Sequence, residues 1–245
     1  MTTRKRRTGD QGAYFRRLSR LILPFPLQRW IASLRAIRGT ADLFGRWAVG
    51  GLHASIASGV TARRWSHVEV GNQSIIDVGT HFHSNDDGKG LRIRIGQRCF
   101  IGRHCFFSAG EAIEIGQDCN IGAACHLLAA GHIYDNPRVP YSAAPVVSYG
   151  RMRLGPNTWL GVGSTLIGDV NIGFGSLLAA GSLLKTSLPP LCLAAGSPAT
   201  IIKVFDWTRQ TWMRLPAEEP ARSAALEHHL ATIPLENNFV RLLEN

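Results

Sequence analysis

Residues 154–184 read LGPNTWLGVGSTLIGDVNIGFGSLLAAGSLL. An aliphatic residue recurs at every sixth position of this stretch, at Leu154, Leu160, Leu166, Ile172, Leu178 and Leu184. A helix repeats its apolar residue about every 3.6 positions and a simple strand every 2, so neither produces this period. A chain that runs straight briefly, turns a corner and repeats does produce it, with three sides in one coil. The stretch therefore predicts an all-β solenoid of hexapeptide repeats.

The same period runs through the preceding residues, where the count restarts at Val70, Ile95 and Ile115 and each step of six reaches another apolar residue. Small residues follow most of these apolar positions by four: Ser74, Thr80, Cys99, Cys105, Cys119, Cys125, Thr158, Ser164, Ser176 and Ser182. Glycine often follows them directly, as at Gly71, Gly96, Gly102, Gly116, Gly122, Gly155, Gly161 and Gly173. We expect the aliphatic residue to fill the interior, the small residue to fit its narrow corners, and glycine to supply unusual turn conformations.

Three insertions interrupt the count: residues 88–94, 113–114 and 133–153. Each follows three complete sextets, so all three should leave from the same corner of the coil. The loop 133–153 should be the largest projection. Loops displayed on a rigid scaffold are where functional sites tend to be built, so this edge is the predicted site.

The composition predicts a soluble cytoplasmic protein. The chain has 245 residues, 45% of them hydrophobic, and no window holds the roughly 18 apolar residues that a membrane span needs. No signal peptide is apparent. Four of the five cysteines occupy the small inward position of the repeat, and unpaired buried thiols suit a reducing compartment.

The net charge of +10 is concentrated near the N-terminus, because residues 1–47 hold eleven Lys and Arg against two Asp. The chain should therefore have three parts: a basic helical arm over 1–50, the solenoid over 51–190, and a C-terminal strand, helix and tail over 191–245. Arginine beside Trp, Phe and Leu favours an arm that contacts an anionic membrane from the cytoplasmic side. The alternative is that its apolar face caps the open end of the solenoid.

Beyond the solenoid, residues 200–205 read as a strand. Asp206 is placed to cap a helix that would hold Trp207, Trp212 and Met213. The tail over residues 216–245 has helix-forming composition.

The run from Phe106 to Lys203 resembles the sugar and polysaccharide O-acetyltransferases of the hexapeptide superfamily. The segments that carry the resemblance are FFSAGEAIEIGQDCNIGAACHLLAAGH, LGPNTWLGVGSTLIGDVNIGFGSLLAAGSLL and LPPLCLAAGSPATIIK. The resemblance implies a left-handed parallel β-helix, to which the residues themselves add a helical N-terminal arm and a short C-terminal helical extension. It also implies acetyl-CoA as co-substrate and a homotrimer whose sites lie between adjacent subunits. It does not extend to residues 1–55.

His132 matches the catalytic histidine of that family. Imidazole has a pKa near 6.5, which suits it to remove a hydroxyl proton as the oxygen attacks a thioester. By resemblance, the backbone amides of Gly161 and Val162 would stabilise the oxyanion that forms. The alternative is that His132 only closes a corner of the coil.

The remaining site residues are also implied by the resemblance. Trp159 matches a residue that lines the acyl and acceptor pocket, although it could instead shield the coil face. Ala180 and Gly181 match the stretch beside the pantetheine arm. Lys185 would meet the phosphates of the coenzyme, where related enzymes usually have Thr-Lys in place of Lys185-Thr186. Ser108 stands near the position of an acceptor-binding Asn, and the loop adds three candidate acceptor contacts: Tyr134, Asp135 and Arg138.

The predicted function is transfer of acetyl to a hydroxyl of a sugar in a surface polysaccharide or glycolipid precursor. Two alternatives stay open, namely N-acylation of an amino sugar nucleotide and a non-catalytic scaffold or binding module. No metal site is predicted, because His81, His104 and His126 lack the close pairing of the zinc enzymes in this superfamily. No motif supports nucleic-acid binding.

Overall fold

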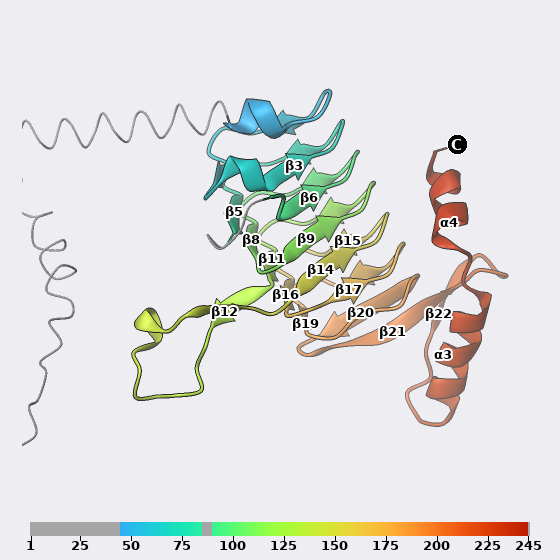
Figure 1. The fold of residues 1–245 in the computed structure, drawn as a ribbon. Coiled ribbons are helices and arrows are strands. Elements are labelled where there is room, and N and C mark those ends of the chain that lie inside the picture. Colours follow the sequence, from blue (N-terminus) through green and yellow to red (C-terminus); the bar gives the residue numbers. More distant parts are fainter. Residues whose placement is uncertain (1–44, 85–89, 245) are drawn as a thin grey trace, which may run out of the picture. The chain divides into compact units, whose positions relative to one another are not determined.

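The computed structural model describes residues 45–84 and 90–244, and residues 44–245 form one compact unit (Figure 1). Short parallel strands stack coil upon coil into three sheets, which are the faces of a solenoid. This confirms the predicted fold class. The predicted basic arm lies outside the described residues, except for a helical turn at residues 45–49.

The three faces are defined by their strands. The first face contains β3 (Val68–Val70), β6 (Ile93–Ile95), β9 (Ala112–Ile115), β14 (Arg151–Leu154) and β17 (Asn171–Ile172). The second face contains β1 (Ser55–Ile56), β4 (Ile75–Ile76), β7 (Phe100–Ile101), β10 (Asn120–Ile121), β15 (Trp159–Leu160), β18 (Leu177–Leu178) and β20 (Cys192–Gly196). The third face contains β2 (Thr61–Ala62), β5 (His81–Ser84), β8 (Phe106–Ala109), β11 (His126–Leu128), β16 (Thr165–Ile167) and β19 (Leu183–Leu184), and a short 3-10 helix, η1 (Trp65–His67), precedes β3.

The hexapeptide count predicts the core correctly. The coil-starting residues pair with one another from coil to coil, in the order Val70, Ile95, Ile115, Leu154 and Ile172. Their exposed fractions lie between 0% and 3%. Aliphatic side chains from successive coils thus form one continuous interior that no single coil could bury.

The small residues of the repeat line the corners of this interior and satisfy its polar groups. The Ser74 hydroxyl donates to the carbonyl of Gly96 (2.8 Å) and accepts from the N–H of Cys99 (2.9 Å). All five cysteines are free and buried, as predicted for the four in the repeat. Burial raises the pKa of the Cys192 thiol to about 12.

The predicted reason for the glycines at the turns is wrong. Gly71, Gly96 and Gly116 are absent from the described residues with positive φ, yet a Cβ on Gly96 would lie 2.6 Å from the backbone of the next coil. Close stacking of the turns therefore excludes any side chain at these positions. The positive φ falls two residues later, on Arg98 (φ 55°) and Asp118 (φ 61°).

The predicted loop 133–153 leaves from the corner where the chain passes from the third face to the first, whereas the predicted insertion 113–114 is wrong, because both residues belong to strand β9 of the first face. Residues 88 and 89 of the remaining insertion lie outside the described residues. The loop lies between Leu128 and Arg151 and contains β12 (Ala130–His132), a 3-10 helix η2 (Tyr141–Ala143) and β13 (Val146–Ser148). β12 and β13 pair antiparallel, and Figure 1 shows this hairpin extending away from the coils. The chain rejoins the first face at Arg151, three residues before Leu154, where the count predicts that the coil resumes.

The helix predicted after Asp206 is wrong, because this segment forms a β-hairpin. β21 (Ala199–Asp206) pairs antiparallel with β20 and with β22 (Thr211–Arg214), so it extends the second face. The Asp206 carboxylate accepts the N–H groups of Thr208 (3.0 Å) and Arg209 (2.9 Å) and closes a tight turn. The hydrogen bond from the Arg209 N–H lowers the pKa of Asp206. The strand predicted over 200–205 is confirmed.

The helical tendency of the tail is confirmed by α3 (Ala221–Thr232) and α4 (Glu236–Leu243). Phe239 of α4 packs on Phe174, with ring centroids 4.7 Å apart.

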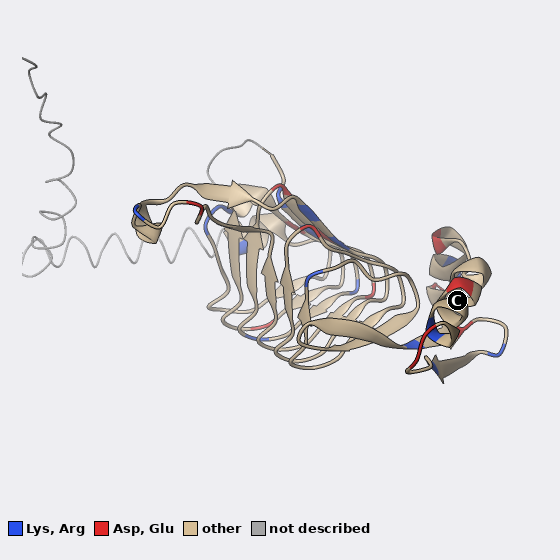
Figure 2. Cartoon of the chain, turned by 90° about the horizontal axis from the view of Figure 1, so that it is seen from below, with Lys and Arg blue, Asp and Glu red and all other residues tan. Residues whose placement is uncertain are grey.

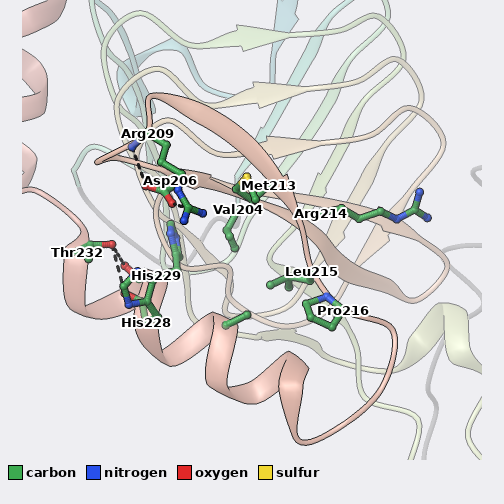
Figure 3. A pocket seen from close by; sticks show the side chains of 11 residues that line it. Val204, Asp206, Arg209, Met213, Arg214, Leu215, Pro216, His228, His229 and Thr232 are labelled. Carbon is green, nitrogen blue, oxygen red and sulfur yellow. Dashed lines mark hydrogen bonds and ion pairs between the residues drawn. The ribbon is translucent and has the colours of Figure 1, made fainter.

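Between α3 and the β21–β22 hairpin lies a cavity of about 250 Å³ (Figure 3). Figure 3 shows Asp206 paired with Arg209 on its wall, while Arg214 extends away from them.

The outward rows of the first and second faces differ in charge. The outward row of the first face reads Glu69, Arg94, Glu114, Arg153 and Asn171. The corresponding row of the second face reads Ser55, Ile75, Phe100, Asn120, Trp159, Leu177 and Leu193, with no charge. Figure 2 shows many of the charged residues of the coils along one side, with others at the turns on the opposite side. Within residues 45–84 and 90–244, no helix has the length and apolar character to cross a membrane.

Candidate active site

His132 ends strand β12 at the root of the projecting hairpin, and its side chain is exposed. Its Nδ1 atom lies 2.8 Å from the carbonyl oxygen of Ala144 on the returning arm of the loop. A carbonyl oxygen only accepts hydrogen bonds, so Nδ1 carries the proton and donates it. In the neutral ring the other nitrogen, Nε2, is then a bare acceptor. This arrangement suits a general base.

A cavity of about 160 Å³ lies beside His132. It is lined by His83, Phe106, Ser108, Ala130, Gly131, His132 and Val146. The structure therefore brings two of the sequence-predicted site residues, His132 and Ser108, to one cavity. None of the lining residues is Lys, Arg, Asp or Glu, so the cavity suits an uncharged group.

Ser108 lies on β8 in the third face and is 9% exposed. Its hydroxyl has no hydrogen-bond partner among the described residues. The hydroxyl oxygen is not among the fully buried polar atoms that lack a partner, so it opens to the cavity, where a ligand or water can reach it. Its backbone carbonyl accepts the N–H of Ala129 (2.9 Å), which ties this coil to the start of the loop.

A second group of predicted residues gathers at the corner between the second and third faces. The N–H of Gly181 donates to the carbonyl of Val162 (2.9 Å), so Val162 and Gly181 lie on stacked turns. Gly181 has a φ of +66°, and a Cβ there would meet no atom within 4 Å. Ala180, beside it, is exposed. The small residues leave an open, shallow surface along this corner.

The two backbone amides predicted to stabilise an oxyanion, those of Gly161 and Val162, differ in whether they already donate a hydrogen bond. The N–H of Gly161 donates to the carbonyl of Leu178 (2.8 Å) as part of the pairing between coils, so it is not available to a substrate. The N–H of Val162 donates to no group among the described residues, and the Val162 side chain is 59% exposed. Of the two predicted amides, that of Val162 is therefore the one without a protein partner among the described residues.

Trp159 and Lys185 flank this corner on different faces. Trp159 lies on β15 in the second face and is 50% exposed, between Asn120 and Leu177 in the outward row. Lys185 directly follows β19 in the third face and is exposed.

The predicted loop contacts, Tyr134, Asp135 and Arg138, all lie beyond β12 in the projecting hairpin and are exposed. Tyr134 is 72% exposed. The N–H of Arg138 donates to the side chain of Asn136 (3.0 Å), which shapes the tip of the loop. None of the three lines the cavity beside His132.

Within one chain the predicted site residues thus form two separate groups. His132 and Ser108 lie toward the corner between the third and first faces, whereas Val162, Ala180 and Gly181 lie at the corner between the second and third faces. The width of the third face stands between them. One chain therefore presents His132 at one edge and the open turns of Val162 and Gly181 at the other.

Sequence reasoning missed His83 as a lining residue of the cavity. A signal was present, because His83 and Ser108 are each the thirteenth residue after their coil starts, Val70 and Ile95. Residues at equal positions of successive coils stack, and β5 and β8 do pair His83 with Ser108. No group of three or more His, Cys, Asp or Glu able to hold a metal ion occurs among residues 45–84 and 90–244.

Comparison with known proteins gives short sequence matches and an extended structural match. No protein-family model matches the chain. A Staphylococcus aureus protein named as an acetyltransferase is 37% identical over 57 residues, which are 23% of this chain and 29% of that protein. A Mycobacterium tuberculosis protein with a similar name is 32% identical over 76 residues, 31% of this chain and 24% of that protein. The chain therefore spans less than a third of the length of these curated relatives.

Solved structures of AntD, an N-acyltransferase from Bacillus cereus, superpose on the chain. The complex of AntD with dTDP and 3-hydroxybutyryl-CoA has a TM-score of 0.56 at 20% identity, over 80% of this chain and 90% of that one. A mutant complex with dTDP-4-amino-4,6-dideoxyglucose and coenzyme A has a TM-score of 0.54 at 23% identity, over 63% and 81%. At this identity the likeness concerns the fold. The chain therefore has the left-handed parallel β-helix fold of the hexapeptide-repeat acyltransferases.

Proposed function

We propose that the chain is an acyl-CoA-dependent O-acyltransferase that moves acetyl from acetyl-CoA to a sugar hydroxyl of a surface polysaccharide or glycolipid precursor. The observation that carries the proposal is the hydrogen bond from His132 Nδ1 to the Ala144 carbonyl, which leaves Nε2 as a base beside a polar cavity. The acyltransferase fold and the short matches to proteins named as acetyltransferases support the same reaction class.

In the proposed reaction, His132 Nε2 takes the proton of the acceptor hydroxyl as its oxygen attacks the thioester carbonyl carbon. The new carbon–oxygen bond forms, the carbon–sulfur bond breaks, and the imidazolium returns its proton to the departing thiolate. A positioned base of this kind is worth roughly 10²–10⁴ in rate. The amide of Val162 is the donor proposed for the oxyanion.

Acetyl-CoA is assigned to the corner that carries Val162, Ala180 and Gly181. Its small side chains and unobstructed surface suit a pantetheine arm that runs close to the backbone. Lys185, exposed after β19, supplies a positive charge for the coenzyme phosphates. Trp159 at the edge of the second face is assigned to the acyl and acceptor pocket.

The active assembly is proposed to be a homotrimer with three sites between adjacent chains. Support comes from the separation of the base from the coenzyme corner in one chain, which a neighbouring chain would bridge. The second face also exposes an uncharged row in which Ile75, Phe100 and Trp159 are 47%, 42% and 50% exposed. Apolar surface of this kind favours contact with another protein surface. The loop residues Tyr134, Asp135 and Arg138 would then approach the acceptor from the projecting hairpin.

The test is thiol release from acetyl-CoA with two sets of acceptors: methyl glycosides and lipid-linked sugars, and amino sugar nucleotides. Mild alkaline hydroxylamine then separates the products, because it cleaves an O-acetyl ester and leaves an N-acetyl amide intact. Thiol release with a hydroxyl acceptor and a hydroxylamine-labile product supports the proposal. A stable product formed only with amino sugars would replace it with N-acylation.

N-acylation is the second candidate because AntD is an N-acyltransferase that binds an amino sugar nucleotide. The proposed base would serve either nucleophile. A non-catalytic binding module is the third candidate. Absence of thiol release with every acceptor, together with normal folding, would favour it.

The chain is further proposed to work in the cytoplasm at the inner face of the membrane. The support is the basic composition of residues 1–47, which lie almost wholly outside the described residues. An acceptor built on a lipid carrier would be found at that surface.

A further inference from the structure

The cavity beside His132 holds a second imidazole that the proposed reaction does not use. His83 of β5 and Ser108 of β8 are paired residues on neighbouring coils of the third face. Neighbouring strands lie about 4.8 Å apart, so the two polar side chains start from adjacent points on one wall. Both line the same cavity of about 160 Å³ as His132.

The position of the His83 ring is constrained by its neighbours. Its ring centroid lies 6.4 Å from that of Phe106 and 6.1 Å from that of His81. His81, in turn, stacks on Phe106 (5.7 Å, 11° between planes), and its Nδ1 lies 2.7 Å from the Thr61 hydroxyl. His83 lines the cavity, and His81 does not.

The lining of the cavity defines the chemical class of its ligand. It contains no Lys or Arg to offset a phosphate or carboxylate, and a neutral ligand group is favoured there. Its polar groups are the serine hydroxyl and two imidazoles, which exchange hydrogen bonds with hydroxyl groups. Phe106 and Val146 supply apolar surface for the carbon face of a sugar ring.

We infer that His83 is a specificity-determining residue, which together with Ser108 binds the hydroxyl adjacent to the one that is acylated. This inference rests on the proposed function. One hydroxyl must face His132 Nε2 for its proton to be removed. The hydroxyl on the neighbouring carbon then lies toward the wall formed by His83 and Ser108. The acceptor is accordingly a neutral sugar that carries two hydroxyls on adjacent ring carbons.

The test is a cycle of enzyme variants against acceptor analogues. The acceptors are methyl glycosides of glucose, galactose, mannose and rhamnose, each with its monodeoxy derivatives, and thiol release from acetyl-CoA is measured. His83→Phe should lower kcat/KM about 10-fold for the parent sugar, which corresponds to one lost hydrogen bond. For the one analogue that lacks the neighbouring hydroxyl, wild type and His83→Phe should be equal. His83→Gln, which keeps a donor and an acceptor, should recover part of the loss.

His126 provides the matched control because it is exposed on the same face, on β11, and does not line the cavity. His126→Phe should leave the discrimination among deoxy analogues unchanged. An equal loss for His83→Phe with the parent and with every analogue would overturn the inference while leaving the proposed function intact. Absence of thiol release with all glycosides in wild type would reject the sugar-hydroxyl function, and this inference with it.

Discussion

His132 and Ala144 are joined by a 2.8 Å hydrogen bond between Nδ1 and the backbone carbonyl oxygen. The two residues stand on opposite arms of the hairpin, His132 at the end of β12 and Ala144 directly after η2. The N–H of Ile133 also donates to the carbonyl of Pro145 (3.0 Å), so the arms are held together at this point. The fold of the loop, not a neighbouring side chain, therefore determines the tautomer of the proposed base.

Replacement of His132 should abolish most of the activity. His132→Ala removes the base, so we expect turnover to fall by roughly 10²–10⁴ with a suitable acceptor. The side chain is exposed, so the thermal midpoint and acetyl-CoA binding should stay near those of the wild type. His126→Ala is the control and should change turnover little. Turnover of His132→Ala close to that of the wild type would refute the assignment.

The amide of Val162 can be removed by proline. Pro156 occupies the equivalent position of the turn after Gly155, so this turn accepts proline and Val162→Pro should fold. If the amide stabilises the oxyanion, kcat should fall about 10²–10³-fold with little change in KM. Ala123→Pro, at the equivalent turn of the preceding coil, is the control. An equal effect of the two substitutions would contradict the assignment.

Stacking of the turns can be tested at Gly96. A Cβ there would lie 2.6 Å from the backbone of Gly116 and Gln117, so Gly96→Ala should lower the free energy of unfolding by about 1–3 kcal/mol. Gly163→Asn is the control, because a Cβ on Gly163 would meet no atom within 4 Å. Gly163 has a φ of +70°, and Asn157 adopts a similar φ of 55° at the equivalent position of another turn. Urea unfolding should show the larger loss for Gly96→Ala. The reverse order would refute the stacking argument.

Assembly through the uncharged second face can be tested at Phe100. Phe100→Asp places a charge on an outward position that is 42% exposed, so the single chain should still fold. We expect light scattering to change from three times the 26.7 kDa chain mass to the mass of one chain, with loss of activity. Arg94→Ala on the charged first face should remain trimeric. A wild-type protein that is an active monomer would disprove the proposed assembly.

The role of the basic arm can be tested by sedimentation with vesicles. The full chain should pellet with vesicles of anionic lipid at low salt, since basic residues gain roughly 1 kcal/mol each near such a surface. A shortened chain that begins at residue 44, where the compact unit starts, should remain in the supernatant. If both chains stay in the supernatant, the arm does not bind membrane, and its alternative role as a cap is favoured.

The sequence predicts the solenoid well because its period repeats in every coil. The steps of six fix the core positions within each coil, and the restarts at Val70, Ile95, Ile115 and Leu154 mark where each coil begins whatever the length of the segment before it. The corner of the loop 133–153 follows from the same count. The hairpin at Asp206 was mispredicted for a local reason, because an aspartate that accepts two following N–H groups begins a helix and a tight turn alike.

The sequence predicts less of the candidate site than of the fold. Motif resemblance identifies His132 and Ser108 separately, but their shared cavity depends on how the root of the hairpin meets the edge of the third face. The participation of the Gly161 N–H in pairing between coils is also invisible in a motif, because it depends on which carbonyl the next coil presents. The tautomer of His132 depends on the backbone carbonyl of Ala144. The residue type at position 144 does not predict that hydrogen bond.

The corner from which the loop 133–153 leaves has a consequence for how such chains diversify. The segment between Leu128 and Arg151 enters and leaves the coils without disturbing the pairing of β9 with β14 or of β11 with β16. Its length and composition can therefore change by insertion or deletion without cost to the register of the rows on either side. A hairpin of another length or sequence, introduced by evolution or by protein engineering, could therefore alter acceptor choice while the paired coils stay the same.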